Sequence, residues 1–118
     1  MEMREIKFRA WIPSTEYMWS WESLVRDKAH LAWLQLEPEY GEKVIMQYTG
    51  LKDKNGVEIY EGDILYKEIT AGNFGSVVVQ FKDARFQVSG TETNLGWIAQ
   101  DAMKVIGNIH ENPDLLKE

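Results

Sequence analysis

Apolar and polar residues alternate along two short stretches near the start of the sequence, residues 6–12 and residues 17–22. Alternation of this kind is typical of a strand with one buried face. The four residues between them, 13–16, are expected to form the loop of a hairpin. The register that leaves one face wholly apolar makes three pairs: Ile12 with Tyr17, Ala10 with Trp19, and Phe8 with Trp21. A slip by one residue would turn Arg9 and Lys7 onto that face, so apolar matching selects the first register.

This register divides the aromatic residues of the hairpin between two faces. The apolar face carries three of them: Tyr17, Trp19 and Trp21. We expect these rings in the core, because a small domain gains much stability from bulky apolar burial. The opposite face carries Trp11 beside an arginine and a methionine, and all three residue types are enriched in protein interfaces. The sequence therefore predicts a candidate partner surface made of Arg9, Trp11 and Met18.

Residues 22–42 permit two interpretations. Val25, Ala29, Ala32 and Leu36 repeat with the spacing of one helical face, whereas residues 33–36 alternate as a strand does. We expect a helix over residues 22–31 and leave helix or strand open for the rest.

A second hairpin follows, with a strand over residues 44–51 and a turn at Asp53-Lys54-Asn55-Gly56. Asp at the first position and Gly at the fourth are typical of a type I turn followed by a left-handed glycine. This turn predicts two cross-strand pairs: Lys52 with Glu58, and Leu51 with Ile59.

The second half of the chain contains a third hairpin. Its turn is expected over residues 82–85, with these apolar residues facing one another across it: Val77, Val79, Phe81, Phe86 and Val88. Two more strands are predicted at residues 97–99 and 104–109. Asn112, followed by Pro113 and an acidic residue, predicts the start of a short helix.

Together these elements predict an α+β fold that is mostly β, in which antiparallel hairpins form a small SH3-like or barrel-like core with one or two short helices. The 118 residues fit one domain, residues 1–118. The 44% hydrophobic and 27% charged fractions are those of an ordinary globular protein. The absence of cysteine favours a reducing compartment. We expect no membrane span, because no apolar run approaches about 20 residues, and no signal peptide.

Three blocks of the sequence resemble the YopX family of bacteriophage and prophage proteins. They are Arg4-Glu5-Ile6-Lys7-Phe8-Arg9-Ala10-Trp11, then Met46 to Gly56 continuing through Glu58 to Ile64, and Val105 to Pro113. They span nearly the whole chain, and residues 12–43 and 68–103 between them match weakly. The resemblance implies a phage or prophage accessory protein in the cytoplasm of a bacterial host. The family carries no assigned reaction, so no catalytic residue is implied. The strand start at residues 61–64 is also similar to an SH3-like barrel, an analogy of fold alone.

Residues that could carry catalysis are sparse. There is no cysteine nucleophile, and neither His30 nor His110 has a second histidine at metal-ligand spacing. Glu61 and Asp63 point to the same side of a strand and could hold a divalent cation. We favour a structural role for this pair, with a bend at Gly62 and the Asp63 carboxylate bonded to the local backbone. No catalytic residue, metal site or cofactor is therefore predicted.

The function predicted from the sequence is a non-enzymatic binding protein, acting as a homo-oligomer or on a host or phage protein. Nucleic-acid binding through Lys7, Arg9 and Trp11 is an alternative, as is a metal-dependent hydrolase that uses Glu61 and Asp63. The net charge of −6 counts against the former, because nucleic-acid affinity rests largely on neutralising phosphates.

Overall fold

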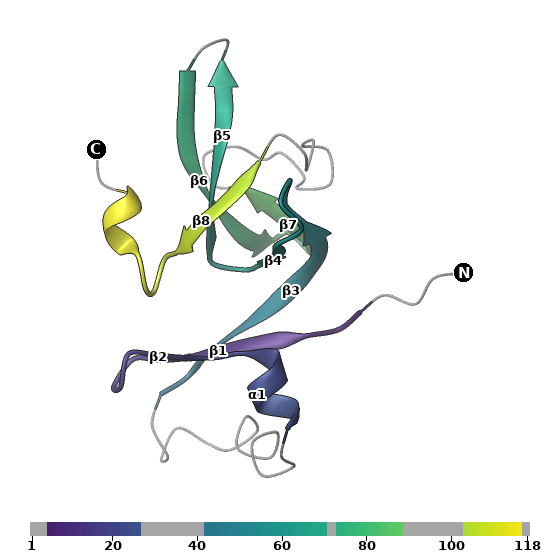
Figure 1. The fold of residues 1–118 in the computed structure, drawn as a ribbon, viewed down its shortest axis with the longest axis vertical. Helices are drawn as coiled ribbons and strands as arrows, with labels where there is room; N and C mark the ends of the chain where they lie inside the picture. Colours follow the sequence, from purple (N-terminus) through teal and green to yellow (C-terminus); the bar gives the residue numbers. More distant parts are fainter. Residues whose placement is uncertain (1–4, 27–41, 71–72, 89–102, 117–118) are drawn as a thin grey trace. The chain divides into compact units, whose positions relative to one another are not determined.

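The computed structural model describes residues 5–26, 42–70, 73–88 and 103–116 (Figure 1). In these ranges the strands are β1 (Phe8–Ile12), β2 (Tyr17–Trp19), β3 (Val44–Lys52), β4 (Glu58–Tyr60), β5 (Asp63–Thr70), β6 (Asn73–Lys82), β7 (Arg85–Val88) and β8 (Lys104–Asn108). The helices are α1 (Trp21–Val25) and the short 3₁₀ helix η4 (Pro113–Leu116). Every strand pair is antiparallel. The predicted fold class, mostly β with short helices, is confirmed.

The chain divides into two compact units, Met1–Gln47 and Tyr48–Glu118, and β3 runs through the boundary between them. In the first unit β1 lies between β2 and β3. The register of the first hairpin is confirmed, with Ala10 opposite Trp19 and Ile12 opposite Tyr17. Whether the chain acts as a single domain stays a prediction.

The helix α1 begins one residue earlier than predicted, at Trp21. The Ser20 side chain caps it by accepting a 3.2 Å hydrogen bond from the backbone N–H of Ser23. Trp21 is therefore helical rather than part of β2, yet its ring still contacts that of Phe8, with centroids 6.2 Å apart. The helix is described as far as Val25, and the later part of the predicted helix, with the open stretch after it, lies outside the described residues.

The hairpin of β3 and β4 contains the predicted turn. Gly56 has a φ of +81°, and its N–H donates a 3.0 Å hydrogen bond to the Asp53 carbonyl. Lys52 lies opposite Glu58 as predicted. The predicted pair Leu51–Ile59 is replaced by a bulge, because three residues of β3, 49–51, stand against Ile59. The Thr49 hydroxyl donates a 2.8 Å bond to the Ile59 carbonyl within it.

The predicted third hairpin is also present, formed by β6 and β7. Its cross-strand pairs are Val79–Val88, Gln80–Gln87, Phe81–Phe86 and Lys82–Arg85. The turn consists of Asp83 and Ala84, whose φ angles of 54° and 63° are those of a type I′ turn. The strand β8 confirms the prediction for residues 104–109, and the predicted strand at 97–99 lies outside the described residues.

The core of the second unit draws residues from four strands and from the start of β8. Its buried members are Ile59, Leu65, Val79, Val88 and Met103. The strands of this unit curl around that cluster in the manner of part of a barrel (Figure 1). Backbone bonds of Gly62 tie its edges, since its N–H donates to the Val79 carbonyl and its carbonyl accepts from Ile109.

Candidate binding surface

The predicted partner surface is wrong in one decisive respect, because Trp11 is buried, with 8% of its area exposed. The reason is the strand order. The prediction treated residues 6–22 as an isolated hairpin, whereas β1 is an inner strand with neighbours on both sides. Trp11 therefore lies between Met18 of β2 and Val44 of β3, which flank its ring on the sheet face.

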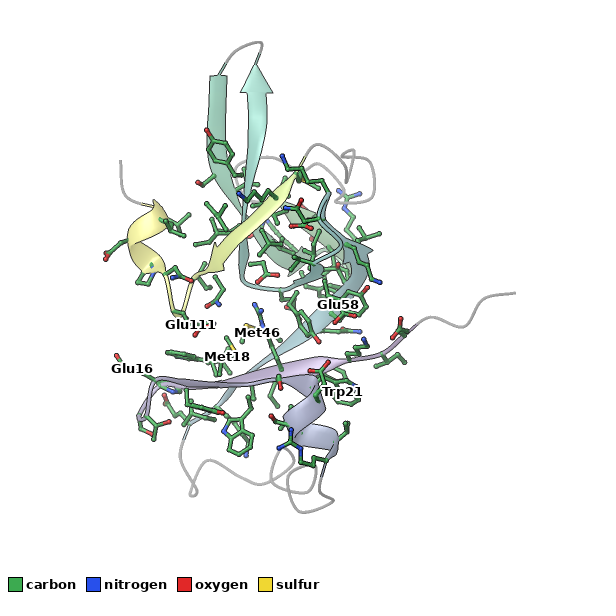
Figure 2. All side chains as sticks on the ribbon, viewed as in Figure 1. Glu16, Met18, Trp21, Met46, Glu58 and Glu111 are labelled. Atoms are coloured by element: carbon green, nitrogen blue, oxygen red, sulfur yellow. The ribbon has the colours of Figure 1, made fainter. Side chains whose placement is uncertain are left out.

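The other two predicted residues lie on the same face of the sheet. Arg9 lies opposite Met46, which is buried, and both Arg9 and Met18 are half-buried. Figure 2 shows Met18 and Met46 on one side of the ribbon of β1 and β2, with Trp21 on the other. We call the first side the methionine face, made of Arg9, Trp11, Met18, Val44 and Met46.

The opposite side of this sheet, here called the aromatic face, carries Phe8, Ala10, Ile12, Tyr17, Trp19 and Ile45. The sequence predicted Tyr17 in the core, yet 53% of its area is exposed. Ile45, which sequence reasoning missed, is 45% exposed. The signal for Ile45 was the run Val44-Ile45-Met46, which makes both faces of β3 apolar when a sheet with one exposed face should alternate.

Tyr17 and Trp19 form an aromatic pair at the edge of the aromatic face. Their ring centroids are 5.4 Å apart and the ring planes meet at 72°, an edge-to-face arrangement. Trp19 and Trp21 are half-buried. The aromatic face thus presents exposed apolar groups at Tyr17 and Ile45, on either side of a fully buried Ala10.

The two carboxylates considered for metal binding are arranged for a structural task. Asp63 is buried, and its Oδ2 accepts a 2.7 Å hydrogen bond from the N–H of Tyr60. Gly62 has a φ of +84° and makes the predicted bend between β4 and β5. Glu61 is half-buried. Over the described ranges, no three acidic or histidine side chains gather as metal ligands.

Asp53 is a second buried carboxylate, and sequence reasoning assigned it only the opening of a turn. Its Oδ1 accepts hydrogen bonds from the N–H groups of Asn55 and Val57, at 2.8 and 2.9 Å. Its Oδ2 accepts a 2.8 Å bond from the N–H of Val105 at β8. Burial alone would raise the pKa of Asp53, but these hydrogen bonds and the positive charge of Lys54 outweigh it and lower the pKa.

A third polar network follows β8. The Asn108 side chain accepts bonds from the N–H groups of His110 and Glu111 and donates a 2.8 Å bond to Glu111 Oε1. The Asn112 side chain accepts from the N–H of Asn108, so it holds β8 instead of capping η4 as the sequence predicted. The backbone of His110 serves this loop, and His30 lies outside the described residues.

Family membership is decided by comparison with known proteins. Residues 7–117 match the family model described as YopX protein. The chain belongs to the YopX family. It is similar to the crystal structure of protein EF1440 from Enterococcus faecalis, with 30% identity and a TM-score of 0.68 over 98% of this chain and all of that one.

The protein is also similar to the crystal structure of yopX from Bacillus subtilis, at 21% identity and a TM-score of 0.62, with 98% and 100% of the two chains covered. No curated protein matches this YopX-family chain. Across the described residues, no helix has both the length and the apolar character that a membrane crossing requires.

The blocks that carried the YopX resemblance can now be placed in the structure. The middle block contains Asp53, Gly56 and Asp63, and the last block contains Asn108 and Asn112. The three acidic and amide side chains with printed bonds in these blocks, together with Asn112, bind backbone groups of turns and strand ends. These signature residues therefore organise the backbone, and their contacts indicate no reaction.

Proposed function

We propose that this YopX-family protein works by binding and not by catalysis, and that it associates with copies of itself through the aromatic face. The observation that supports the proposal is the joint exposure of Tyr17 and Ile45 on one face of a small sheet. An apolar group left in water is stabilised when a partner covers it, by about 25 cal/mol for each Å² removed from solvent.

The charge pattern of the face supports a partner that is not strongly charged. None of the residues that define the aromatic face carries a charge, although the chain as a whole has a net charge of −6. Two copies can therefore approach through this face with less repulsion than through the acidic remainder of the surface. A self-complementary patch of this kind is what a two-fold symmetric dimer requires.

The burial of Trp11 weighs against the nucleic-acid alternative. A stacking platform needs an exposed ring, and 8% exposure leaves little ring surface for a base. Lys7, a second member of that predicted platform, forms an ion pair with Glu5 at 3.1 Å. We propose further that the protein acts in the cytoplasm of a bacterial host as a phage or prophage accessory protein, which the bacterial sources of the similar structures support.

The test is the mass of the protein in solution over a wide range of concentrations, by sedimentation velocity and light scattering. We expect a multiple of the 13.7 kDa chain mass, which falls on dilution. The double variant Tyr17→Ser with Ile45→Ser should shift the equilibrium to the monomer.

A matched control removes comparable exposed groups from the second unit. Tyr66 and Val57 are 44% and 47% exposed, so the double variant Tyr66→Ser with Val57→Ser should keep the wild-type mass. A monomeric wild type at every concentration would contradict the proposal, and so would equal effects of the two double variants.

A further inference from the structure

The strand β2 lies at the outer edge of its sheet, whose order is β2-β1-β3-β4. An edge strand can serve as a template for another strand, and natural proteins usually blunt such edges with charges, proline or bulges. β2 consists of Tyr17, Met18 and Trp19, and none of these three residues is charged. The edge therefore lacks the devices that discourage pairing within the strand itself.

We propose that β2 pairs antiparallel with β2 of a second copy, about a two-fold axis at Met18, so that the two sheets join into one. This inference rests on the proposed self-association and specifies its interface. In this register Met18 lies opposite the partner's Met18, and Tyr17 lies opposite the partner's Trp19. The arrangement is isologous, because each protomer offers the same three residues.

The distribution of charge selects a second copy as the occupant. A two-fold axis brings each side chain at the axis against its own copy, so a charge there would repel itself. Met18 is uncharged, and the nearest charged residue, Glu16, would lie opposite the partner's Ser20. Any other two-fold register sets at least one strand residue against the 13–16 turn or against α1.

The side chains of β2 are also arranged to gain from this pairing. Directly opposed residues in an antiparallel pair have Cβ atoms about 4.5–5.5 Å apart. The Tyr17–Trp19 pair of each protomer, with centroids 5.4 Å apart, would therefore adjoin the partner's pair. The seam covers Tyr17, an exposed ring of the aromatic face, and joins the two Met18 side chains on the methionine face.

A cysteine introduced at the axis tests this geometry directly. The chain contains no cysteine, so Met18→Cys provides one thiol per protomer. Opposed residues of a strand pair lie within the roughly 4.4–6.8 Å Cα separation that a disulfide spans. We expect mild oxidation of Met18→Cys to yield a cross-linked dimer on a non-reducing gel.

Ser14→Cys is the control for random collision. It lies in the same hairpin and is exposed. In the proposed register the two copies of residue 14 are eight strand positions apart, or roughly 26 Å at about 3.3 Å for each residue. It should therefore show only background cross-linking. An oligomer in which Met18→Cys cross-links no better than Ser14→Cys would overturn the seam while leaving the self-association in place.

A second pair of variants keeps the proposal testable if Met18→Cys fails to fold, as circular dichroism would show. Tyr17→Lys places a charge against the partner's Trp19 and should weaken association at least tenfold. Ile45→Lys alters the same face on β3, away from the seam, and should leave the dissociation constant within twofold of wild type. A stronger effect of Ile45→Lys would mean that the faces stack instead, and a monomeric wild type would overturn both proposals.

Discussion

The Asp53 carboxylate accepts a 2.8 Å hydrogen bond from the N–H of Val105, a residue 52 positions later in the chain. The neighbouring backbone makes a parallel connection, because the N–H of Lys54 donates a 3.1 Å bond to the Met103 carbonyl. The turn between β3 and β4 is thus held against the start of β8. These two bonds fasten the sequence-local hairpin to a distant strand of the same unit.

Replacing Asp53 should therefore cost more than an ordinary turn substitution. Asp53→Ala removes the acceptor for three backbone N–H groups, and hydrogen bonds to charged groups contribute about 1.5–3 kcal/mol each at most. Water can satisfy the groups nearest the surface, so we expect a loss of about 3 kcal/mol in the free energy of unfolding. Urea denaturation measures it, and Asp83→Ala in an exposed turn is the control. A loss of less than about 1 kcal/mol would contradict this account of the turn.

The same carboxylate gives the stability a pH dependence with a defined sign. The pKa of Asp53 is lower in the folded chain than its usual value, so the ionised form stabilises the fold. This contribution is present above the unfolded pKa, about 4, and is lost as the pH falls through the lower folded pKa. The measurement compares wild type with Asp53→Asn, which cannot titrate at this position. The gap between their unfolding free energies should narrow from neutral pH to about pH 3, and a constant gap would count against the argument.

The turn of the β6–β7 hairpin predicts a stabilising substitution. Ala84 has a φ of 63°, a left-handed conformation that costs a residue with a Cβ roughly 1 kcal/mol. Glycine is preferred at this position of a type I′ turn. Ala84→Gly should therefore raise the free energy of unfolding by about 0.5–1 kcal/mol, as measured by thermal and urea denaturation.

Gly56→Ala is the reciprocal control for that experiment. Gly56 has a φ of +81°, and a Cβ there would meet nothing within 4 Å, so any effect comes from the backbone conformation alone. We expect a loss of about 1 kcal/mol or more. Two substitutions that shift stability in the same direction would show that left-handed strain is not the controlling factor.

Gly107 is required for a close approach and not for an unusual φ. A Cβ at this position would lie 2.5 Å from Asn112 Oδ1 and 2.9 Å from Leu115 Cδ1. Gly107→Ala must displace the Asn112 side chain that accepts from the N–H of Asn108, at a cost of about 1–3 kcal/mol. In a double-mutant cycle, Gly107→Ala should cost less in an Asn112→Ala background. Additive losses would show that the two residues are not coupled.

Local patterns were enough to predict the hairpins, and the reason is physical. The pairing of Ala10 with Trp19, and of Phe81 with Phe86, follows from alternation and loop length within a dozen residues. The structural role of Asp63 was also predictable, because its hydrogen-bond donor is only three residues away.

The candidate surface could not be predicted in the same way. Whether Trp11 or Tyr17 is exposed depends on the pairing of β1 with β3, which joins residues more than thirty positions apart. Neither alternation nor turn chemistry contains information about that neighbour. The third hydrogen bond of Asp53 escaped prediction for the same reason, since Val105 lies far along the chain.

The placement of β8 beside β5 has a consequence for how fast the second unit folds. Asp63 pairs with Asn108, and Asp53 waits for Val105, so neither contact forms until a long loop has closed. Closing about 50 residues costs on the order of 3–4 kcal/mol of chain entropy before any bond returns it. Domains dominated by such distant pairings fold over roughly milliseconds to seconds, instead of the microseconds of helical bundles. During that interval the cluster around Leu65 stands open on the side that β8 will close, and the rate at which β8 arrives limits how long it remains so.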